Sequence, residues 1–200
     1  MLKKHGGCSE CIEMVESAMD SRKRDKGGSI MAVIDDYTGP AMEFITRGFM
    51  CVNEGDLDGA IVNYTQALRL DPKNGAAYAN RGNAYFMKGD HHRAIEDCTQ
   101  AIELDFLGKF GLAYQVRGIA YSQIGEDDLA LPDLDRAIMV APNEPYTHFI
   151  RGAVYFKKGK YAQAIADYER ALLLEPDSPL AVHWKQMLEK ARQAQATQRR

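Results

Sequence analysis

The residues whose types and spacing could do chemistry lie near the start of the chain. Cys8 and Cys11 form a Cys-x-x-Cys pair, and His5 precedes them at the same spacing. Such a pair can hold half of a tetrahedral zinc site or act as a redox dithiol. A structural zinc site needs four ligands, however, and the sequence has no second Cys-x-x-Cys and no βαβ pattern for thioredoxin-like chemistry. We expect an exposed terminus without metal, and a metal- or thiol-responsive regulator using Cys8 and Cys11 stays as an alternative function.

The other candidate groups do not form a catalytic set. His91 and His92 are sequence neighbours that would point about 100° apart on a helix, which favours a solvated pair over a metal site. Cys51 and Cys98 fall inside helical patterns and are predicted to be core thiols. No glycine-rich phosphate loop follows a convincing strand. We therefore predict no enzyme activity, no cofactor and no bound metal.

Composition narrows the class of protein. The 200 residues are 46% apolar and 26% charged, as in soluble globular proteins. There is no apolar run long enough to span a membrane and no apolar segment behind the polar N-terminus, so a cytoplasmic location without a membrane partner is expected. The net charge of −3 gives no strong positive field for nucleic acid. Residues 41–184 are mildly acidic, whereas residues 185–200 are basic.

An internal repeat organises most of the chain. An Arg-Gly pair recurs four times, and when its glycine is numbered position 8 the units are 41–74, 75–110, 111–144 and 145–178. Positions 15, 20 and 27 then hold small residues in every unit: Gly55, Gly89, Gly125 and Gly159; Ala60, Ala94, Ala130 and Ala164; Ala67, Ala101, Ala137 and Ala171. Positions 4, 8 and 11 share one helical face, which predicts a core face on a first helix. The glycine at position 15 is expected to end that helix, and small residues at positions 8, 20 and 27 are expected to let two helices approach closely.

The repeat resembles the tetratricopeptide repeat (TPR) family, whose unit is a helix-turn-helix of 34 residues. The resemblance covers residues 41–178 and implies an all-α fold, a right-handed α-solenoid of four TPR units, the second with a two-residue insertion. A helix over 179–196, with Trp184 in the core, is predicted to cap the last unit, and residues 197–200 form a basic tail. Residues 1–40 are predicted to be an N-terminal extension with a possible helix over 9–24 and a hinge at 26–29.

Local signals predict how the second helix of each unit begins. Asp56, Asp90 and Glu126 follow the turn glycine and are expected to cap that helix or to lie in its first turn. Pro132 sits early in the second helix of unit three, where we expect a local bend.

Position 7 is arginine in all four units, where the family pattern has leucine. Arg81, Arg117 and Arg151 each have an aspartate at position 23 of their own unit, whereas unit one combines Arg47 with Asn63. Both positions lie where the two helices of a unit face each other. We predict partly buried Arg-to-Asp hydrogen bonds with a structural role.

The family lines a concave surface with its first helices, and positions 2, 5, 9 and 12 form one stripe away from the predicted core. This stripe, with one neighbouring asparagine, is the predicted peptide-binding groove. It is apolar and aromatic at both ends, and such an exposed stripe usually marks a partner site. Its predicted residues are Met42, Ile45, Phe49, Val52, Asn80, Asn83, Phe86, Leu112, Gln115, Ile119, Tyr146, Phe149 and Phe156.

One activity that the resemblance suggests is excluded by the residues present. Many co-chaperone members of the family hold C-terminal carboxylates with Lys, Asn and Arg side chains at fixed positions of three successive units. Counted from unit one, those positions hold Ile45, Phe49, Asn80, Leu112 and Val116; counted from unit two, they hold Ala79, Asn83, Val116, Tyr146 and Ile150. Without cations the groove cannot compensate for desolvating an anionic tail.

The leading hypothesis is a non-enzymatic adaptor or scaffold that binds a peptide or helix of another protein in an apolar concave groove. The alternative from another class is a self-assembly module whose N-terminal segment occupies its own or a neighbour's groove, so a homo-oligomer is possible. Ile30 to Ile34 is apolar enough to cover unit one.

Overall fold

The computed structural model describes residues 39–105, 108 and 110–198, and the chain divides into two units, 1–39 and 40–200. The predictions made for His5, Cys8, Cys11, the helix over 9–24, the hinge at 26–29 and the apolar segment 30–34 lie outside the described residues. Residues 199–200 of the basic tail do so as well.

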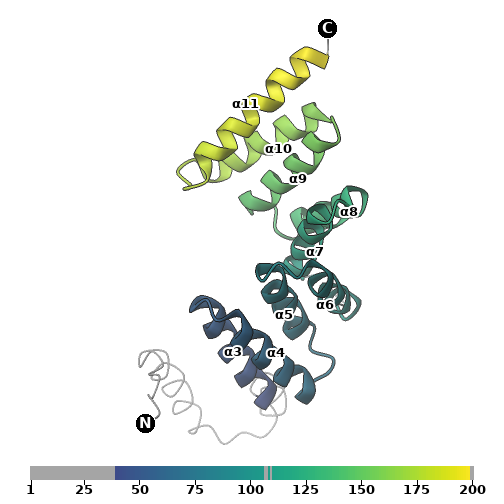
Figure 1. Cartoon of the computed structure of the whole chain (residues 1–200), viewed down its shortest axis with the longest axis vertical. Coiled ribbons are helices and arrows are strands. Elements are labelled where there is room, and N and C mark those ends of the chain that lie inside the picture. The colour runs from purple at the N-terminus through teal and green to yellow at the C-terminus, as the bar shows by residue number, and fades with distance from the viewer. Residues whose placement is uncertain (1–38, 106–107, 109, 199–200) are drawn as a thin grey trace, which may run out of the picture. The chain divides into compact units, whose positions relative to one another are not determined.

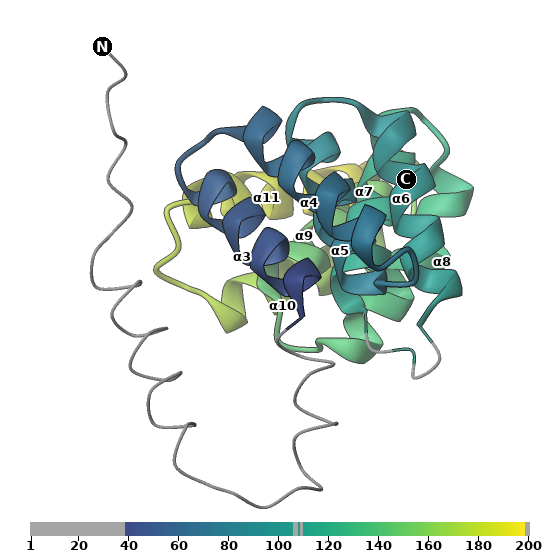
Figure 2. The ribbon, with the colours of Figure 1, turned by 90° about the horizontal axis from the view of Figure 1, so that it is seen from below.

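Regular structure in the described part of the chain is entirely α-helical. The helices are α3 (Pro40–Asn53), α4 (Leu57–Leu70), α5 (Gly75–Met87), α6 (His91–Glu103), α7 (Gly111–Gln123), α8 (Asp127–Val140), α9 (Pro145–Lys157), α10 (Tyr161–Leu174) and α11 (Ala181–Gln198). Each helix packs against the next one along the chain, as two perpendicular views show (Figures 1 and 2). Helices α3 to α10 form four successive pairs, one in each repeat, and α11 follows alone. The predicted all-α solenoid is confirmed.

The turn inside each pair depends on the glycine at position 15. Gly55, Gly89, Gly125 and Gly159 have φ angles of 78°, 81°, 89° and 70°, a left-handed conformation that disfavours residues with a Cβ. Asp56 and Asp90 then cap the next helix, because their carboxylates accept hydrogen bonds from the amides of Gly59 and Arg93. Glu126 occupies the same place before α8 without a side-chain cap. Helix α8 continues through Pro132, and the bend expected there stays a prediction.

Small residues bring the helices of a pair into close contact. The alanines at positions 20 and 27 are buried in all four units. A Cβ placed on Gly82 would lie 2.8 Å from the sulfur of Cys98 and 3.2 Å from the carbonyl oxygen of Ala94. Cys98 is a fully buried free thiol, as predicted, and Cys51 is a half-buried one. The close approach therefore depends on the absence of a side chain at position 8.

The core face of the first helix is wider than the predicted stripe. Positions 3 and 10 are buried in units two to four, at Ala77, Ala84, Ala113, Ala120, Thr147 and Val154. Positions 4 and 11 are mostly half-buried aromatic residues. Ala113 and Ala120 of α7, for example, share a cluster with Ala94 and Cys98 of α6. The first helix must pack against the preceding unit as well as its own partner, which explains the difference.

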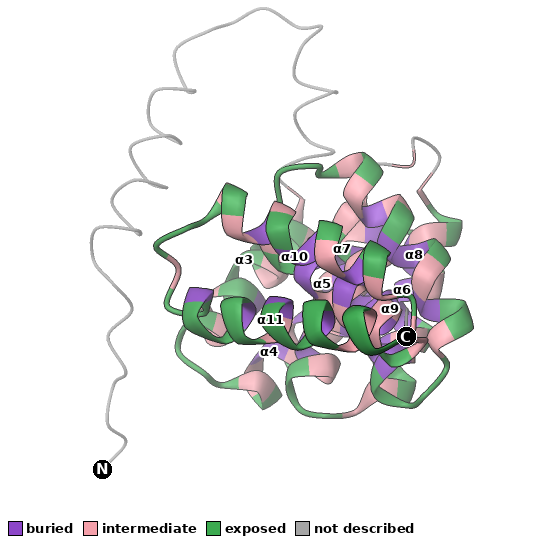
Figure 3. Cartoon of the chain, turned by 90° about the horizontal axis from the view of Figure 1, so that it is seen from above, coloured by how far each residue is buried: buried purple, intermediate pink, exposed green. Residues whose placement is uncertain are grey.

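Helix α11 covers the last unit, two residues later in the sequence than predicted. Trp184 is 1% exposed and packs with Tyr168 of α10 and Leu188 of its own helix, so its predicted place in the core is confirmed. Figure 3 shows exposed residues along one side of α11 and buried residues along the other.

Candidate functional site

The residues of the predicted groove all lie on α3, α5, α7 and α9, the first helices of the four pairs. Met42, Phe49, Leu112 and Tyr146 are the large apolar side chains among them that are exposed, Phe49 most of all at 57%. The half-buried members are Ile45, Val52, Asn80, Asn83, Phe86, Gln115 and Phe156. The exposed members occupy position 2 or 9, so the outer part of the predicted stripe is accessible.

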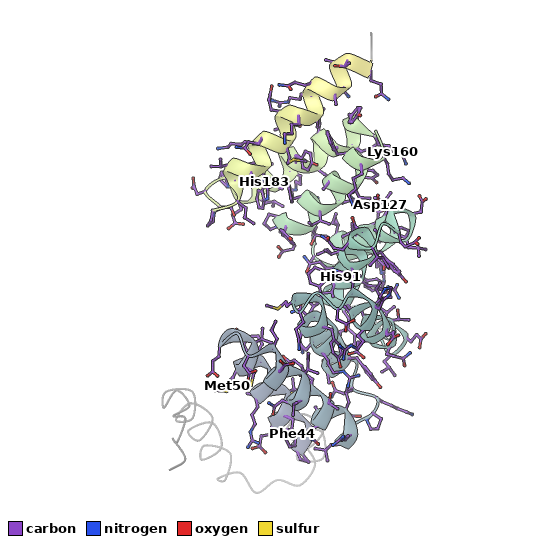
Figure 4. All side chains as sticks on the ribbon, in the orientation of Figure 1. Phe44, Met50, His91, Asp127, Lys160 and His183 are labelled. Carbon is purple, nitrogen blue, oxygen red and sulfur yellow. The ribbon has the colours of Figure 1, made fainter. Side chains whose placement is uncertain are left out.

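Two of the predicted groove residues are in the core, which corrects their expected exposure. Phe149 is 8% exposed, because its ring stacks on Trp184 at a centroid distance of 5.7 Å and lies 5.4 Å from Tyr168. His183 of α11, labelled in Figure 4, meets Phe149 edge-on at 5.5 Å. Helix α11 therefore covers position 5 of unit four.

Ile119 is buried for a similar reason. It belongs to a cluster with Ala130 and Leu134 of α8 and Val154 of α9. Position 9 thus faces the following unit in α7, whereas in α3 the same position exposes Phe49.

The position-7 arginines of units two, three and four pair with the aspartate at position 23, as predicted. Arg81 donates from Nε and Nη2 to the two carboxylate oxygens of Asp97 at 2.7 and 2.8 Å. Arg117 with Asp133 and Arg151 with Asp167 repeat this geometry. The hydrogen bonds to these aspartates raise the pKa of each arginine, so the guanidinium stays charged.

Each of these arginines also contacts the preceding unit, which the sequence analysis missed. The remaining Nη1 donates to position 25 of that unit: Arg81 to Thr65 at 3.1 Å, Arg117 to Thr99 at 3.0 Å and Arg151 to Asp135 at 2.7 Å. The arginines therefore join three helices and are not available to a ligand.

Unit one departs from this arrangement. Arg47 is exposed and pairs with Glu43 one turn earlier on α3, while Asn63 donates to the carbonyl oxygen of Gly59 at 2.8 Å. The combination of Arg47 with Asn63 does not form, because a neutral amide attracts the guanidinium more weakly than the carboxylate of Glu43 does.

The exposed stripe is uncharged. Positions 2, 5, 9 and 12 hold no Lys, Arg, Asp or Glu in any of the four units. Lys157, which follows the stripe on α9, lies 3.5 Å from the carboxylate of Asp127 and donates to the carbonyl oxygen of Ser122 at 3.2 Å. The arrangement can bury apolar surface of a ligand but offers little to an anion.

A pocket of about 320 Å³ adjoins the groove, and the sequence analysis did not find it. Gln115, a predicted groove residue, donates from Nε2 to the hydroxyl of Thr147 at 2.6 Å. The sequence does contain one sign of this pocket: position 3 of unit four is Thr147, which is buried, whereas units two and three have alanine there. The lining comprises Gly111, Leu112, Gln115, Ala137, Val140, Ala141, Glu144 and Thr147.

The remaining candidate groups lie apart. Within residues 39–105, 108 and 110–198, no three His, Cys, Asp or Glu side chains are placed to hold a metal. His92 is exposed, but His91 is half-buried with its ring 5.5 Å from that of Phe86, which corrects the expectation of a fully solvated pair.

Successive helix pairs of similar length, each with small residues at the same repeat positions, define a helical-repeat protein. A family described as TPR repeat matches residues 48–89, and one described as tetratricopeptide repeat matches residues 75–105 and 145–178. The chain is a tetratricopeptide repeat protein. Among the described residues, no helix is both long and apolar enough to cross a membrane.

Known proteins agree with this assignment. Human tetratricopeptide repeat protein 36 is 40% identical over 58 residues, which are 29% of this chain and 31% of the relative. The matched segments span about a third or less of the curated relatives' own length. The crystal structure of MamA superimposes with a TM-score of 0.62 and 27% identity, over 77% of this chain and 87% of MamA. The second TPR domain of human RPAP3, solved in complex with the HSP70 peptide SGPTIEEVD, gives a TM-score of 0.51 and 33% identity over 57% of this chain and 92% of that domain.

Proposed function

We propose that this protein is a non-enzymatic adaptor that binds an apolar peptide or helix of another protein along its first helices. The observation that carries the proposal is the exposure of Met42, Phe49, Leu112 and Tyr146 at positions 2 and 9. These four side chains stay exposed while Ile119 and Phe149 of the same stripe pack against the next unit and against α11. Exposed aromatic and long apolar side chains are the common anchors of protein interfaces.

The chemistry of the stripe favours an apolar partner over an anionic one. The RPAP3 domain of similar fold was solved with the peptide SGPTIEEVD, in which three of the last four residues are acidic. Here the positions at which related domains carry cations for such tails hold no charged residue: they are Ile45, Leu112 and Val116 counted from unit one, and Ala79, Tyr146 and Ile150 counted from unit two. We therefore expect binding to depend weakly on salt, because little charge is available for salt to screen.

Selection from a random-peptide phage library on the intact chain tests the proposal. Phe49→Ala and Tyr146→Ala should each weaken binding of a selected peptide by about 1 kcal/mol or more, as truncated aromatic anchors do. Leu173→Ala is the matched control, since Leu173 is an apolar side chain of α10 that is 72% exposed but lies outside the stripe. Circular dichroism should show all three variants folded. Equal loss in the control, or no loss in either aromatic variant, would refute the groove.

A further inference from the structure

The pocket beside the groove has apolar walls and a polar rim. It lies among the start of α7, the end of α8 and the start of α9, with Leu112, Val140 and Ala141 among its wall residues. Its volume of about 320 Å³ is at the lower end of the range for ligand pockets. A space of this size suits one long side chain.

The polar side chains that line the pocket include two acceptors, those of Gln115 and Glu144. Gln115 donates its amide N–H to Thr147, which leaves its carbonyl oxygen as an acceptor. Glu144 is the one charged residue in the lining, and no cation lines the pocket.

Glu144 is exposed and has no partner within the described residues. It precedes α9 as the N-cap residue, yet its side chain accepts no hydrogen bond from the first turn of that helix. No ion pair or side-chain hydrogen bond joins it to any residue of the described part of the chain. Its carboxylate is therefore available to a ligand group of opposite charge.

We propose that this pocket binds a lysine or arginine side chain of the partner segment. The aliphatic stem packs against Leu112 and Val140, and the cationic head meets Glu144 and the carbonyl oxygen of Gln115. An acidic side chain would be repelled by Glu144. The inference rests on the proposed function, because Leu112 and Gln115 belong to the groove; it adds that the partner is an apolar segment with one basic residue.

The test compares peptides selected from a random-peptide library on the intact chain, on Glu144→Gln and on Glu126→Gln. Glu126 is the matched control, because it too is an exposed N-cap residue without a side-chain cap, and it lies outside the pocket. We expect apolar peptides with lysine or arginine enriched at one position on the intact chain and on Glu126→Gln. That enrichment should disappear on Glu144→Gln.

A selected peptide then measures the contact. Replacing its basic residue by uncharged norleucine, or replacing Glu144 by Gln, should each weaken binding about three- to tenfold, as expected for a partly exposed charge pair. The two changes combined should cost little more than either alone, because they remove the same interaction. If the two fold losses of affinity multiply in the combined variant, the proposed contact between the basic residue and Glu144 is wrong.

The outcomes separate the two proposals. Peptides without a basic preference, or with the same preference on Glu144→Gln, would overturn the basic-residue pocket and leave the apolar groove in place. An intact chain that selects no peptide would overturn the groove and the pocket together.

Discussion

Replacing Asp97 by Ala tests whether the position-7 arginines stabilise the array. The change removes both hydrogen bonds from Arg81 to the carboxylate, and the guanidinium keeps the hydroxyl of Thr65 and its contacts with the rings of Tyr78 and Tyr85. The two side chains are 17% and 9% exposed, so the pair lies between a surface ion pair and a buried one. Breaking such pairs costs about 0.2 to 1 kcal/mol at the surface and about 3 to 5 kcal/mol when one charge is left buried.

The expected net cost is about 2 kcal/mol. Arg81 retains some contact with water, which places the loss near the middle of that range, and the better helix propensity of alanine offsets up to about 0.7 kcal/mol. Asp97→Asn, which keeps one acceptor, should cost about half as much. The matched control is Glu43→Ala, which breaks the exposed pair with Arg47 and should cost less than about 0.5 kcal/mol.

Urea unfolding followed by circular dichroism measures the loss of stability. Because repeat arrays can unfold in parts, amide hydrogen exchange in α5 and α6 should be measured in parallel. Exchange there should rise in Asp97→Ala and not in Glu43→Ala. If Asp97→Ala is no less stable than Glu43→Ala, the arginines do not act as structural bridges, and the reasoning from their geometry is refuted.

Three further predictions follow from burial. Phe149→Ala should destabilise the C-terminal unit by about 3 to 5 kcal/mol and shift the emission of Trp184, the single tryptophan, to longer wavelength; an unchanged spectrum would contradict the stacking. Gly82→Ala should cost about 1 to 3 kcal/mol in urea unfolding, because the new methyl group meets Cys98, and an unaffected midpoint would contradict the close approach. Burial raises the pKa of Cys98 from 9.0 to about 12, so the native thiol should resist alkylation above pH 9.0, as peptide mapping can show. The unfolded thiol ionises first, so this group should lower stability as the pH rises from 9.0 toward 12, and rapid modification of the native chain would count against its burial.

Features set within one repeat could be predicted from the sequence. Gly89 ends a first helix, and Arg81 pairs with Asp97, because both depend on residues of a single helix pair whose spacing recurs in every unit.

Features set between repeats could not be predicted. Burial at position 3 depends on how closely the preceding unit approaches, and a helical period alone gives no such distance. Phe149 has the spacing of a groove residue, yet α11 covers it because that helix packs as another first helix would. The pocket beside Glu144 needs three helices from two units, so no spacing within one unit reveals it.

The charged pair on α3 has a consequence for filament formation. Head-to-tail stacking of identical copies would generate an open-ended fibre, and it would require the face of α3 that corresponds to the unit-to-unit contact in α5, α7 and α9. On that face Glu43 and Arg47 take positions 3 and 7, with side chains 62% and 56% exposed. In the later units position 3 is a buried small residue, and the arginine at position 7 donates a hydrogen bond to the preceding unit. A stacked copy would have to desolvate both charges without a carboxylate at position 23 to receive Arg47. Burying this face of α3 against an identical copy would therefore cost free energy that the unit-to-unit contacts of α5, α7 and α9 do not cost.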